Sequence, residues 1–240
     1  MLERVTDTRV DLSRSAARFG AGVFETLRIQ EGRPRRLHLH LERLAAGCAF
    51  LGLDEPPGPE AILEGLTLPA QGVLRLLAVD DTLLVWSGPL EAVPAQGLRL
   101  GLSRETLRHP GPLTRHKTTS HLENLCLMAE ARNRGLDEVV APTPQGRLSD
   151  GGRSTLVALL DNRLLTPPLE DGALPGIGRR VLLEAGALEE APLRWEDLGR
   201  AQAVALVSAL RGLRAVAEVE GQGVLAANHP GLEGARALLA

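Results

Sequence analysis

The sequence contains a single lysine, Lys117, beside 26 arginines among its 240 residues. An amine that loses its proton can attack a carbonyl carbon or act as a base, whereas the arginine guanidinium stays protonated in proteins. A chain that uses arginine wherever only positive charge is needed is expected to keep a lysine where amine chemistry is needed. Composition alone supports this interpretation and chance survival of the residue equally.

Two further features suit an aromatic ligand that carries a phosphate. Asp150 lies in the stretch LSDGG and can pair with a protonated ring nitrogen, or is a solvated turn aspartate. Residues 176–179 (GIGR) come where a loop enters a predicted helix. The free amides of Ile177 and Gly178 would bind a phosphate there, or only begin a helix.

Arg43 follows His40 by three residues on the polar face of a predicted helix. It is either a phosphate ligand or a salt-bridged surface arginine. Together with Lys117, Asp150 and the glycine-rich helix start, it completes the set of groups that binds pyridoxal phosphate: an imine-forming amine, a carboxylate for the ring nitrogen and a phosphate cup.

Hydrophobic periodicity predicts the elements that position these residues. In the first half we expect a hairpin (23–29 and 34–39), a helix from His40, a short helix (60–66) and two strands (72–79 and 82–87). In the second half we expect a strand (98–103), a polar loop (104–115), a helix (121–134) that stops at Gly135, strands at 137–142, 147–149, 155–160, 163–166, 203–208 and 213–219, and helices near 176 and at the end of the chain.

A segment rich in proline and glycine separates these halves, which predicts a small α/β domain over 1–92, a linker at 93–97 and a larger domain over 98–240.

Composition and motifs exclude several classes of protein. The net charge is −3, without a basic excess for nucleic acid or membranes. The sequence has no Walker A lysine, no HExxH and no CxxC. The positions of Cys48 and Cys126 in apolar patterns predict reduced core thiols. The N-terminal stretch lacks the apolar core of a signal peptide, so we expect a soluble cytoplasmic protein.

Two other chemistries fit the sequence less well. His38 and His40 are spaced to bind a metal, but no third ligand accompanies them, so a structural role is favoured and no metal is expected. Gly20 and Gly22 are followed by Glu25 where a dinucleotide-binding loop needs glycine.

Five ordered segments resemble the fold type IV pyridoxal-phosphate enzymes, which comprise branched-chain aminotransferases, D-amino acid aminotransferases and 4-amino-4-deoxychorismate lyases. They are 18–28 (RFGAGVFETLR), 40–44 (HLERL), 116–124 (HKTTSHLEN), 165–169 (LTPPL) and 174–179 (LPGIGR). The resemblance covers nearly the whole chain and implies an α+β fold of two domains, the larger with a barrel-like sheet, with the cofactor site at the domain interface. It also implies a homodimer.

The resemblance assigns roles residue by residue. Lys117 would form the Schiff base with pyridoxal 5'-phosphate and transfer protons, and Asp150 would stand on the ring nitrogen where the family has glutamate. The phosphate would be held by Arg43, the amides of Ile177 and Gly178, and further donors at Ser208 and Ala209.

The sequence departs from the family pattern at three other places. Ala21 replaces an aspartate, His121 stands where a tyrosine usually contacts the cofactor, and Ser154 and Thr155 stand where an asparagine is usual. His121 is either a replacement hydrogen-bond partner or a surface histidine at a helix start. These departures motivate one alternative, an inactive binding subunit on the same fold; retention of the sole lysine argues against it.

The stretch 207–216 (VSALRGLRAV) resembles the lyase subgroup more than the branched-chain aminotransferases. We therefore expect a 4-amino-4-deoxychorismate lyase that releases pyruvate and 4-aminobenzoate for folate synthesis. A branched-chain or D-amino acid aminotransferase is the alternative. Arg28, Arg75 and Arg104 are candidates for binding the carboxylates of the substrate.

Overall fold

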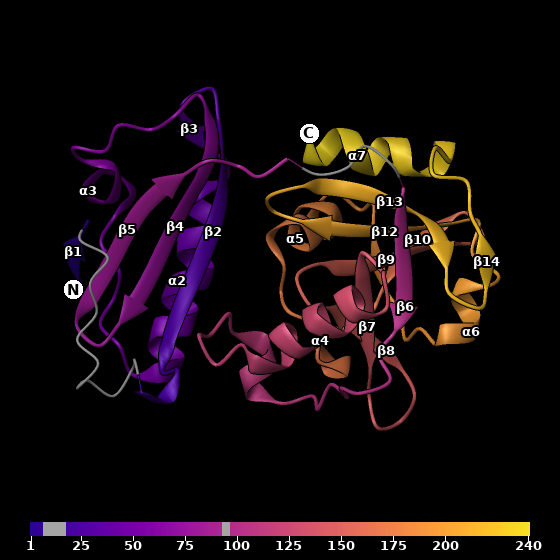
Figure 1. Ribbon diagram of the computed structural model, residues 1–240. Coiled ribbons are helices and arrows are strands. Elements are labelled where there is room, and N and C mark those ends of the chain that lie inside the picture. Colours follow the sequence, from indigo (N-terminus) through magenta and orange to yellow (C-terminus); the bar gives the residue numbers. More distant parts are fainter. Residues whose placement is uncertain (7–17, 93–96) are drawn as a thin grey trace. The chain divides into compact units, whose positions relative to one another are not determined.

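The computed structural model describes residues 1–6, 18–92 and 97–240, and its chain divides into two compact units (Figure 1). The first unit comprises Met1–Val93 and His116–His121, and the second comprises Pro94–Arg115 and Leu122–Ala240. Most of the linker expected at 93–97 lies outside the described residues. The segment that carries Lys117 belongs to the first unit, although the sequence places it within the expected range 98–240.

In the part of the first unit that the structure describes, α2 and α3 accompany a five-stranded sheet with the strand order β1-β5-β4-β2-β3. The elements of this part are β1 (Glu3–Val5), β2 (Gly22–Gln30), β3 (Arg33–Pro34), α2 (Leu37–Leu51), α3 (Pro59–Leu63), β4 (Gln71–Val79) and β5 (Thr82–Gly88). β2, β4 and β5 are antiparallel neighbours, while the short β1 runs parallel to β5.

Alternation along β2 explains how the sheet meets α2. Val23, Leu27 and Ile29 are buried in a core that also contains Leu44 and Cys48 of α2, and the helix lies along this strand (Figure 1). The spacing of Leu41, Leu44 and Cys48 by three and four residues in the sequence predicts this apolar face of α2.

The hairpin and helix predicted between residues 34 and 40 need a correction. β3 is only two residues long, and α2 begins at Leu37 rather than following a strand that runs to residue 39. Arg36 lies in the left-handed region at φ 52°, which turns the chain directly from β3 into the helix.

The segment 116–121 adds to the edge of this unit through β2. Thr118 forms a β-bridge with Val23, and the amides of Phe24 and Thr119 donate to the carbonyls of Lys117 and Gly22 at 2.9 and 2.8 Å. These two bonds flank Thr118, so the backbone is fixed to β2 from the Lys117 carbonyl onward.

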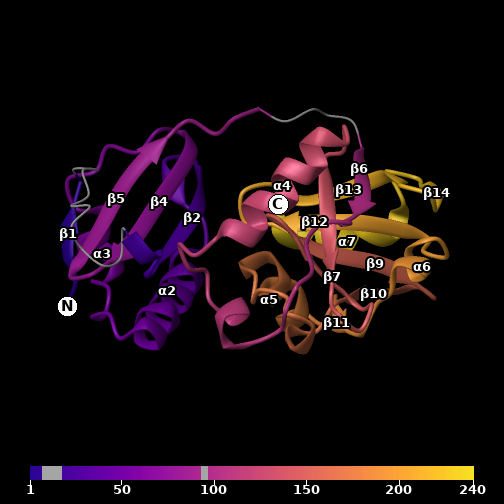
Figure 2. The same cartoon turned by 60° about the horizontal axis from the view of Figure 1, so that its bottom comes forward.

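The second unit is built on a nine-stranded sheet that curls through the order β11-β10-β9-β12-β13-β6-β7-β8, with β14 paired to β13 (Figure 2). Its strands are β6 (Leu98–Leu102), β7 (Glu138–Pro142), β8 (Leu148–Gly151), β9 (Thr155–Leu160), β10 (Arg163–Thr166), β11 (Glu189–Glu190), β12 (Ala203–Ser208), β13 (Gly212–Val219) and β14 (Gly223–Val224). Its helical segments are η1 (Pro112–Arg115), α4 (Leu122–Asn133), η2 (Leu169–Asp171), α5 (Ile177–Glu184), α6 (Trp195–Leu198), η3 (Pro230–Leu232) and α7 (Glu233–Leu239).

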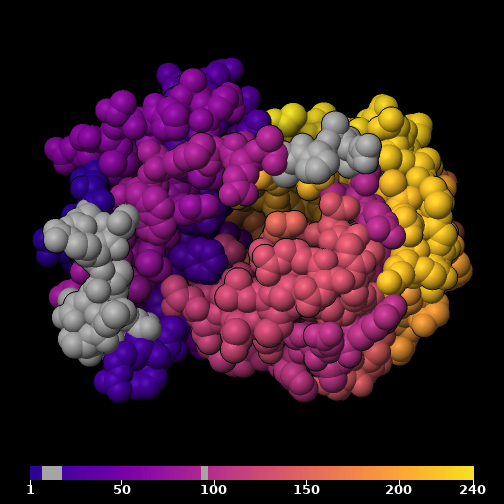
Figure 3. All heavy atoms as spheres, in the orientation of Figure 1, coloured from indigo at the N-terminus to yellow at the C-terminus, as the bar shows by residue number. Residues whose placement is uncertain are grey.

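The sheet of the second unit packs on both faces. On one face α5 and α7 bury residues that include Val157, Ala205 and Leu182, and on the other face Leu148, Leu156 and Leu206 belong to a separate core. α4 lies against β7, and residues of α4 and of the C-terminal part form much of the surface seen in Figure 3. The expected α+β fold with two sheet-containing units is confirmed.

Two smaller expectations are wrong. Asp150 is a buried residue of strand β8 and not a turn residue, because β8 pairs with β7 up to Gly151. Cys48 is a buried thiol, as expected, but Cys126 is exposed on α4. No helix among the described residues is long and apolar enough to cross a membrane.

Candidate functional site

Lys117 lies over an aromatic ring in the first unit. Its Nζ is 4.3 Å from the centre of the Phe24 ring, and the ring of His121 packs edge-on against the same phenyl group at 5.4 Å. Phe24 therefore contacts both the sole lysine and His121, the predicted replacement for the family tyrosine. A phenyl ring stabilises a nearby ammonium only weakly.

The environment of Lys117 favours the reactive, neutral amine. Burial and the positive charge of Arg43 lower the pKa of Lys117 from 10.5 to about 8, against an opposing effect of Glu25. A lysine with this pKa holds a useful fraction of free amine near neutral pH.

Arg43 is not a solvated surface residue: a buried carboxylate binds it. Its Nε and one terminal nitrogen donate to the two oxygens of Glu25 at 2.7 and 2.8 Å. Nδ1 of His40, one turn earlier on α2, lies 2.6 Å from the same carboxylate. Burial alone would raise the pKa of Glu25, but the charge of Arg43 and the hydrogen bonds outweigh it and lower the pKa to about 2.

Glu25 was not among the predicted site residues, although its position in the sequence carries a signal. In the alternating strand 23–29, Glu25 occupies an inward position between Val23 and Leu27. A carboxylate at an apolar position requires buried partners. His40 and Arg43, spaced three apart on the facing helix, are those partners.

Two of the three candidate substrate arginines lie on one face of the first sheet. Arg75 is directly opposite Thr26, so its side chain shares a face with Phe24, Thr26 and Arg28, which alternate along β2. This is the face over which Lys117 lies. Nε of Arg28 is buried and has no hydrogen-bond partner among the described residues.

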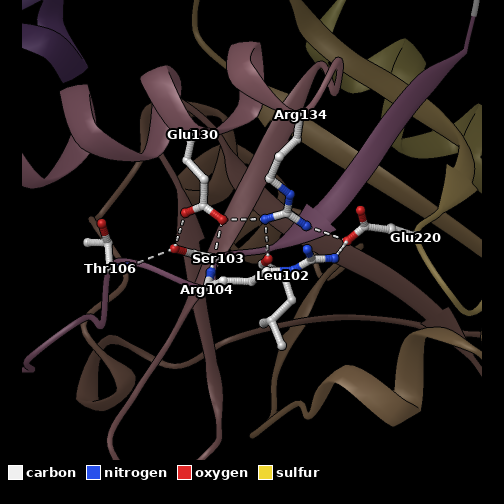
Figure 4. A network of polar contacts seen from close by, with 7 residues as sticks. All are labelled: Leu102, Ser103, Arg104, Thr106, Glu130, Arg134 and Glu220. Atoms are coloured by element: carbon white, nitrogen blue, oxygen red, sulfur yellow. Dashed lines mark hydrogen bonds and ion pairs between the residues drawn. The ribbon is translucent and has the colours of Figure 1, made fainter.

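The third candidate, Arg104, belongs to a different network in the second unit. Its side chain pairs with Glu220 at 3.1 Å, and its amide donates to the buried Glu130 at 2.9 Å (Figure 4). Ser103 and Arg134 complete the bonds of Glu130, and Arg134 also pairs with Glu220. This network joins the end of β6 to α4, and it engages the side chain of Arg104 within the second unit.

Asp150 provides a buried carboxylate in the second unit. Its Oδ2 accepts the amide of Leu174 at 2.9 Å, while Oδ1 is buried without a hydrogen-bond partner among the described residues. Burial raises the pKa of Asp150 to about 6, and the Leu174 amide and the charges of Arg179 and Arg108 oppose that rise. The sequence analysis gave these two arginines no role.

α5 begins three residues after Leu174, whose amide donates to Asp150. The amides of Ile177 and Gly178 lie in the first turn, where a helix offers no acceptor of its own. A Cβ on Gly176 would lie 3.0 Å from Oγ1 of Thr155, and one on Gly178 would lie 2.5 Å from Val207, so the turn packs directly on β9 and β12.

The other predicted phosphate donors, Ser208 and Ala209, lie at the end of β12, the strand on which the first turn of α5 packs. Thr155 and Val207 are register partners on β9 and β12, and β12 ends at Ser208, whose hydroxyl accepts the amide of Arg211 at 3.2 Å. Ala209 begins the turn into β13.

Ser154 belongs to the turn between β8 and β9 and contacts a second buried carboxylate. Its carbonyl accepts the Gly151 amide at 2.9 Å, while its hydroxyl is buried without a hydrogen-bond partner among the described residues; the neighbouring carboxylate is that of Glu138. Glu138 also accepts the amide of Arg153 at 3.0 Å. Burial raises the pKa of Glu138 despite these bonds.

The structure thus collects the predicted residues into two groups. Arg28, Arg43, Arg75, Lys117 and His121 belong to the first unit, and Arg104, Asp150, Ser154, Thr155, Ile177, Gly178, Ser208 and Ala209 belong to the second.

Comparison with known proteins identifies the family. The model of the family described as Amino-transferase class IV matches residues 22–219, which include Lys117 and both groups of residues. The chain belongs to the class IV aminotransferase family.

Relatives of this class IV chain carry more than one activity. It is 28% identical over 232 residues to a bifunctional aminodeoxychorismate lyase and D-amino acid transaminase of Mycobacterium tuberculosis, an alignment that covers 81% of this chain and 80% of the relative. It is 27% identical over 192 residues to an aminodeoxychorismate lyase of Bacillus subtilis, covering 69% of this chain and 64% of that protein. A hypothetical aminotransferase from Mycobacterium tuberculosis, solved in a pyridoxal-phosphate-bound form, matches at 28% identity and a TM-score of 0.80, covering 93% of this chain and 89% of the other.

Class IV aminotransferases depend on pyridoxal phosphate, and the side chains described here fit that group. The buried Asp150 oxygen without a partner suits a ring N–H, and the first turn of α5 offers amides for a phosphate. This chain is therefore a pyridoxal-phosphate-dependent enzyme.

Proposed function

We propose that this enzyme is a 4-amino-4-deoxychorismate lyase, which releases pyruvate and 4-aminobenzoate for folate biosynthesis. The observation that carries the proposal is the pair of arginines on the Lys117 face of the first sheet, Arg28 and Arg75. The lyase substrate carries two carboxylates, and two guanidinium groups match them in number and charge. A branched-chain amino acid has one carboxylate and an apolar side chain.

The residues of the first unit would bind substrate and move the proton. Arg28 and Arg75 would orient the substrate by its carboxylates, and Nζ of Lys117 would take a proton from the substrate carbon that bears the amino group and return one to the departing fragment. Its lowered pKa suits this exchange, because the amine can both accept and release a proton near neutral pH. His121, against the Phe24 ring, would contact the cofactor where the family uses tyrosine.

The predicted cofactor-binding residues would hold pyridoxal phosphate. Asp150 would keep a proton on the ring nitrogen, and when bound the cofactor supplies an electron sink for the pair of electrons left on the substrate carbon. The phosphate would be bound by Arg43, by the amides of Ile177 and Gly178, and by Ser208 and Ala209. Ser154 and Thr155 complete the proposed cofactor contacts.

The lyase reaction needs no water, oxidant or second substrate, because 4-aminobenzoate and pyruvate together account for every atom of the substrate. Transamination by contrast requires a 2-oxo acid to accept the amino group. We further propose a cytoplasmic homodimer; light scattering of the purified protein tests the oligomeric state.

A D-amino acid or branched-chain aminotransferase is the second candidate, favoured by the double activity named for the Mycobacterium tuberculosis relative.

The deciding experiment incubates the purified, cofactor-loaded enzyme with 4-amino-4-deoxychorismate alone, and separately with D-alanine or leucine plus 2-oxoglutarate. We expect equal amounts of pyruvate and 4-aminobenzoate in the first mixture. Lys117→Ala provides the background rate for both mixtures. Turnover confined to the second mixture would show an aminotransferase and refute the lyase proposal.

A further inference from the structure

Glu25 is a charged residue at the centre of an apolar interface. It lies on the face of β2 that packs against α2, between the buried Val23 and Leu27, and is 1% exposed. A carboxylate at this depth is costly unless it is paired and hydrogen-bonded. Glu25 meets that condition with two partners that both come from α2.

The two partners hold Glu25 in different ways. Arg43 forms a two-bond contact to both carboxylate oxygens, at 2.7 and 2.8 Å, which fixes the plane of its guanidinium. His40, 2% exposed, contributes Nδ1 at 2.6 Å to the oxygen Oε2. The carboxylate therefore cannot turn without breaking a bond to one of them.

The Glu25 carboxylate and its two partners are connected to Lys117 through Phe24, the residue of β2 that precedes Glu25. The amide of Phe24 donates to the Lys117 carbonyl, and the Phe24 ring lies under the Lys117 amine. Among the described groups, Arg43 and Glu25 are the charges that act on that amine, with opposite signs. The ring of His121 also packs against this phenyl group, with the ring centres 5.4 Å apart.

Resting on the proposed function of Arg43 and Lys117, we propose that Glu25, held by His40, is the positioning residue of this half of the site. It fixes the Arg43 guanidinium for a phosphate and offsets the charge of Arg43 beside Lys117. Neither Glu25 nor His40 touches the reacting atoms.

The Glu25 side chain would act through two properties, its negative charge and its length. Glu25→Gln keeps the shape and removes the charge, so the amine of Lys117 loses its favourable neighbour. Glu25→Asp keeps the charge and shortens the side chain by one methylene, so the two-bond contact with Arg43 is lost while the field at Lys117 is largely retained.

The first measurement is the pKa of Lys117 in the full-length protein freed of cofactor. After reductive methylation with ¹³C-formaldehyde, NMR reports only Lys117 and the N-terminal amine, because the chain has a single lysine. We expect Glu25→Gln to lower the pKa of Lys117 by about half a unit or more and Arg43→Gln to raise it by a similar amount. Glu64→Gln, which neutralises an exposed carboxylate of the same unit, should leave it unchanged.

The second measurement compares binding of pyridoxal phosphate with binding of pyridoxal, which lacks the phosphate. In Glu25→Asp and in His40→Gln the preference for the phosphorylated form should fall about tenfold, with a pKa of Lys117 close to that of the wild type. Circular dichroism identifies variants that do not fold, and the remaining variants still decide the question.

The proposal is overturned if Glu25→Gln or Arg43→Gln leaves the pKa of Lys117 unchanged, or if both Glu25→Asp and His40→Gln keep the full preference for the phosphate. Neither readout involves turnover, so failure of the lyase assay would leave this test intact.

Discussion

The amino group of Lys117 lies 4.3 Å from the centre of the Phe24 ring, while the Phe24 amide donates to the Lys117 carbonyl at 2.9 Å. One residue of β2 thus positions both ends of the sole lysine. Because β2 is anchored across its length to β4 and on one face to α2, the amine is placed by the rigid part of the first unit.

The lowered pKa of Lys117 predicts how its reactivity depends on pH. With a pKa of about 8, the neutral fraction at pH 7 is about 10%, compared with about 0.03% at the ordinary value of 10.5. The rate of acylation of Lys117 in the cofactor-free protein should therefore rise with pH and reach half its maximum near pH 8. Mass spectrometry of the Lys117 peptide measures it, with N-acetyl-lysine amide as the control. A rate that climbs only above pH 10 would contradict the account.

Asp150→Asn should stabilise the cofactor-free protein and impair the enzyme. Folding raises the pKa of Asp150 from 3.8 to about 6, so the folded state binds more protons and wild-type stability falls as pH rises through that window. Replacing the buried charge should raise the free energy of unfolding by about 3 kcal/mol at pH 7, with no gain below the unfolded-state pKa of Asp150.

The same Asp150→Asn variant, loaded with cofactor, should lose about 100-fold in turnover, because an amide cannot hold the ring proton as a carboxylate does. Asp150→Glu is the matched variant, since it restores the residue usual in the family. Denaturant titrations at several pH values and product assays separate the two effects. An Asn variant that is less stable than the wild type at pH 7 would contradict the expectation that burial of the Asp150 charge destabilises the folded protein.

Gly151 should tolerate no side chain while Glu138 is present. A Cβ at Gly151 would lie 2.3 Å from Oε1 of Glu138, well inside van der Waals contact. We expect Gly151→Ala to lower the free energy of unfolding by about 2 kcal/mol. In a Glu138→Ala background the same substitution should cost much less, so thermal or denaturant unfolding of the four proteins should show a non-additive cycle. Additive losses would mean that the two residues do not collide.

Arg28→Gln and Arg75→Gln should each raise KM for 4-amino-4-deoxychorismate about tenfold or more, because each removes a charged hydrogen bond to a carboxylate. Arg33→Gln, an exposed arginine of β3 in the same unit, is the control and should leave KM unchanged. Unchanged KM values in both test variants would remove the observation on which the choice of lyase rests.

Much of the fold was predictable from local patterns. The alternation of 23–29, the three- and four-residue spacing of Leu41, Leu44 and Cys48, and the glycine at 135 each predicted a strand, a helix or a helix end that the structure confirms. β1 was missed because it is three residues long and depends on pairing with the distant β5.

The candidate site was predictable only in part, for a similar reason. Lys117 and Asp150 were predicted from their side-chain chemistry. The burial of Asp150 was not, because it depends on the pairing of β8 with β7, whereas the glycines that follow Asp150 indicate a turn. Glu25 and its partners Arg43 and His40 are brought together by the packing of α2 on β2, a contact between segments separated in the chain. Composition and spacing indicate such residues without indicating their partners.

The proposed chemistry requires the amine of Lys117 to be the group that bonds to the cofactor. Borohydride reduction of the loaded enzyme, followed by peptide mass spectrometry, tests it most directly, because no other lysine exists to compete. The account predicts the mass of one reduced cofactor on the peptide that contains Lys117 and none on Lys117→Arg, which keeps the charge without the reactive amine. An unmodified Lys117 peptide from enzyme that has bound the cofactor would contradict it.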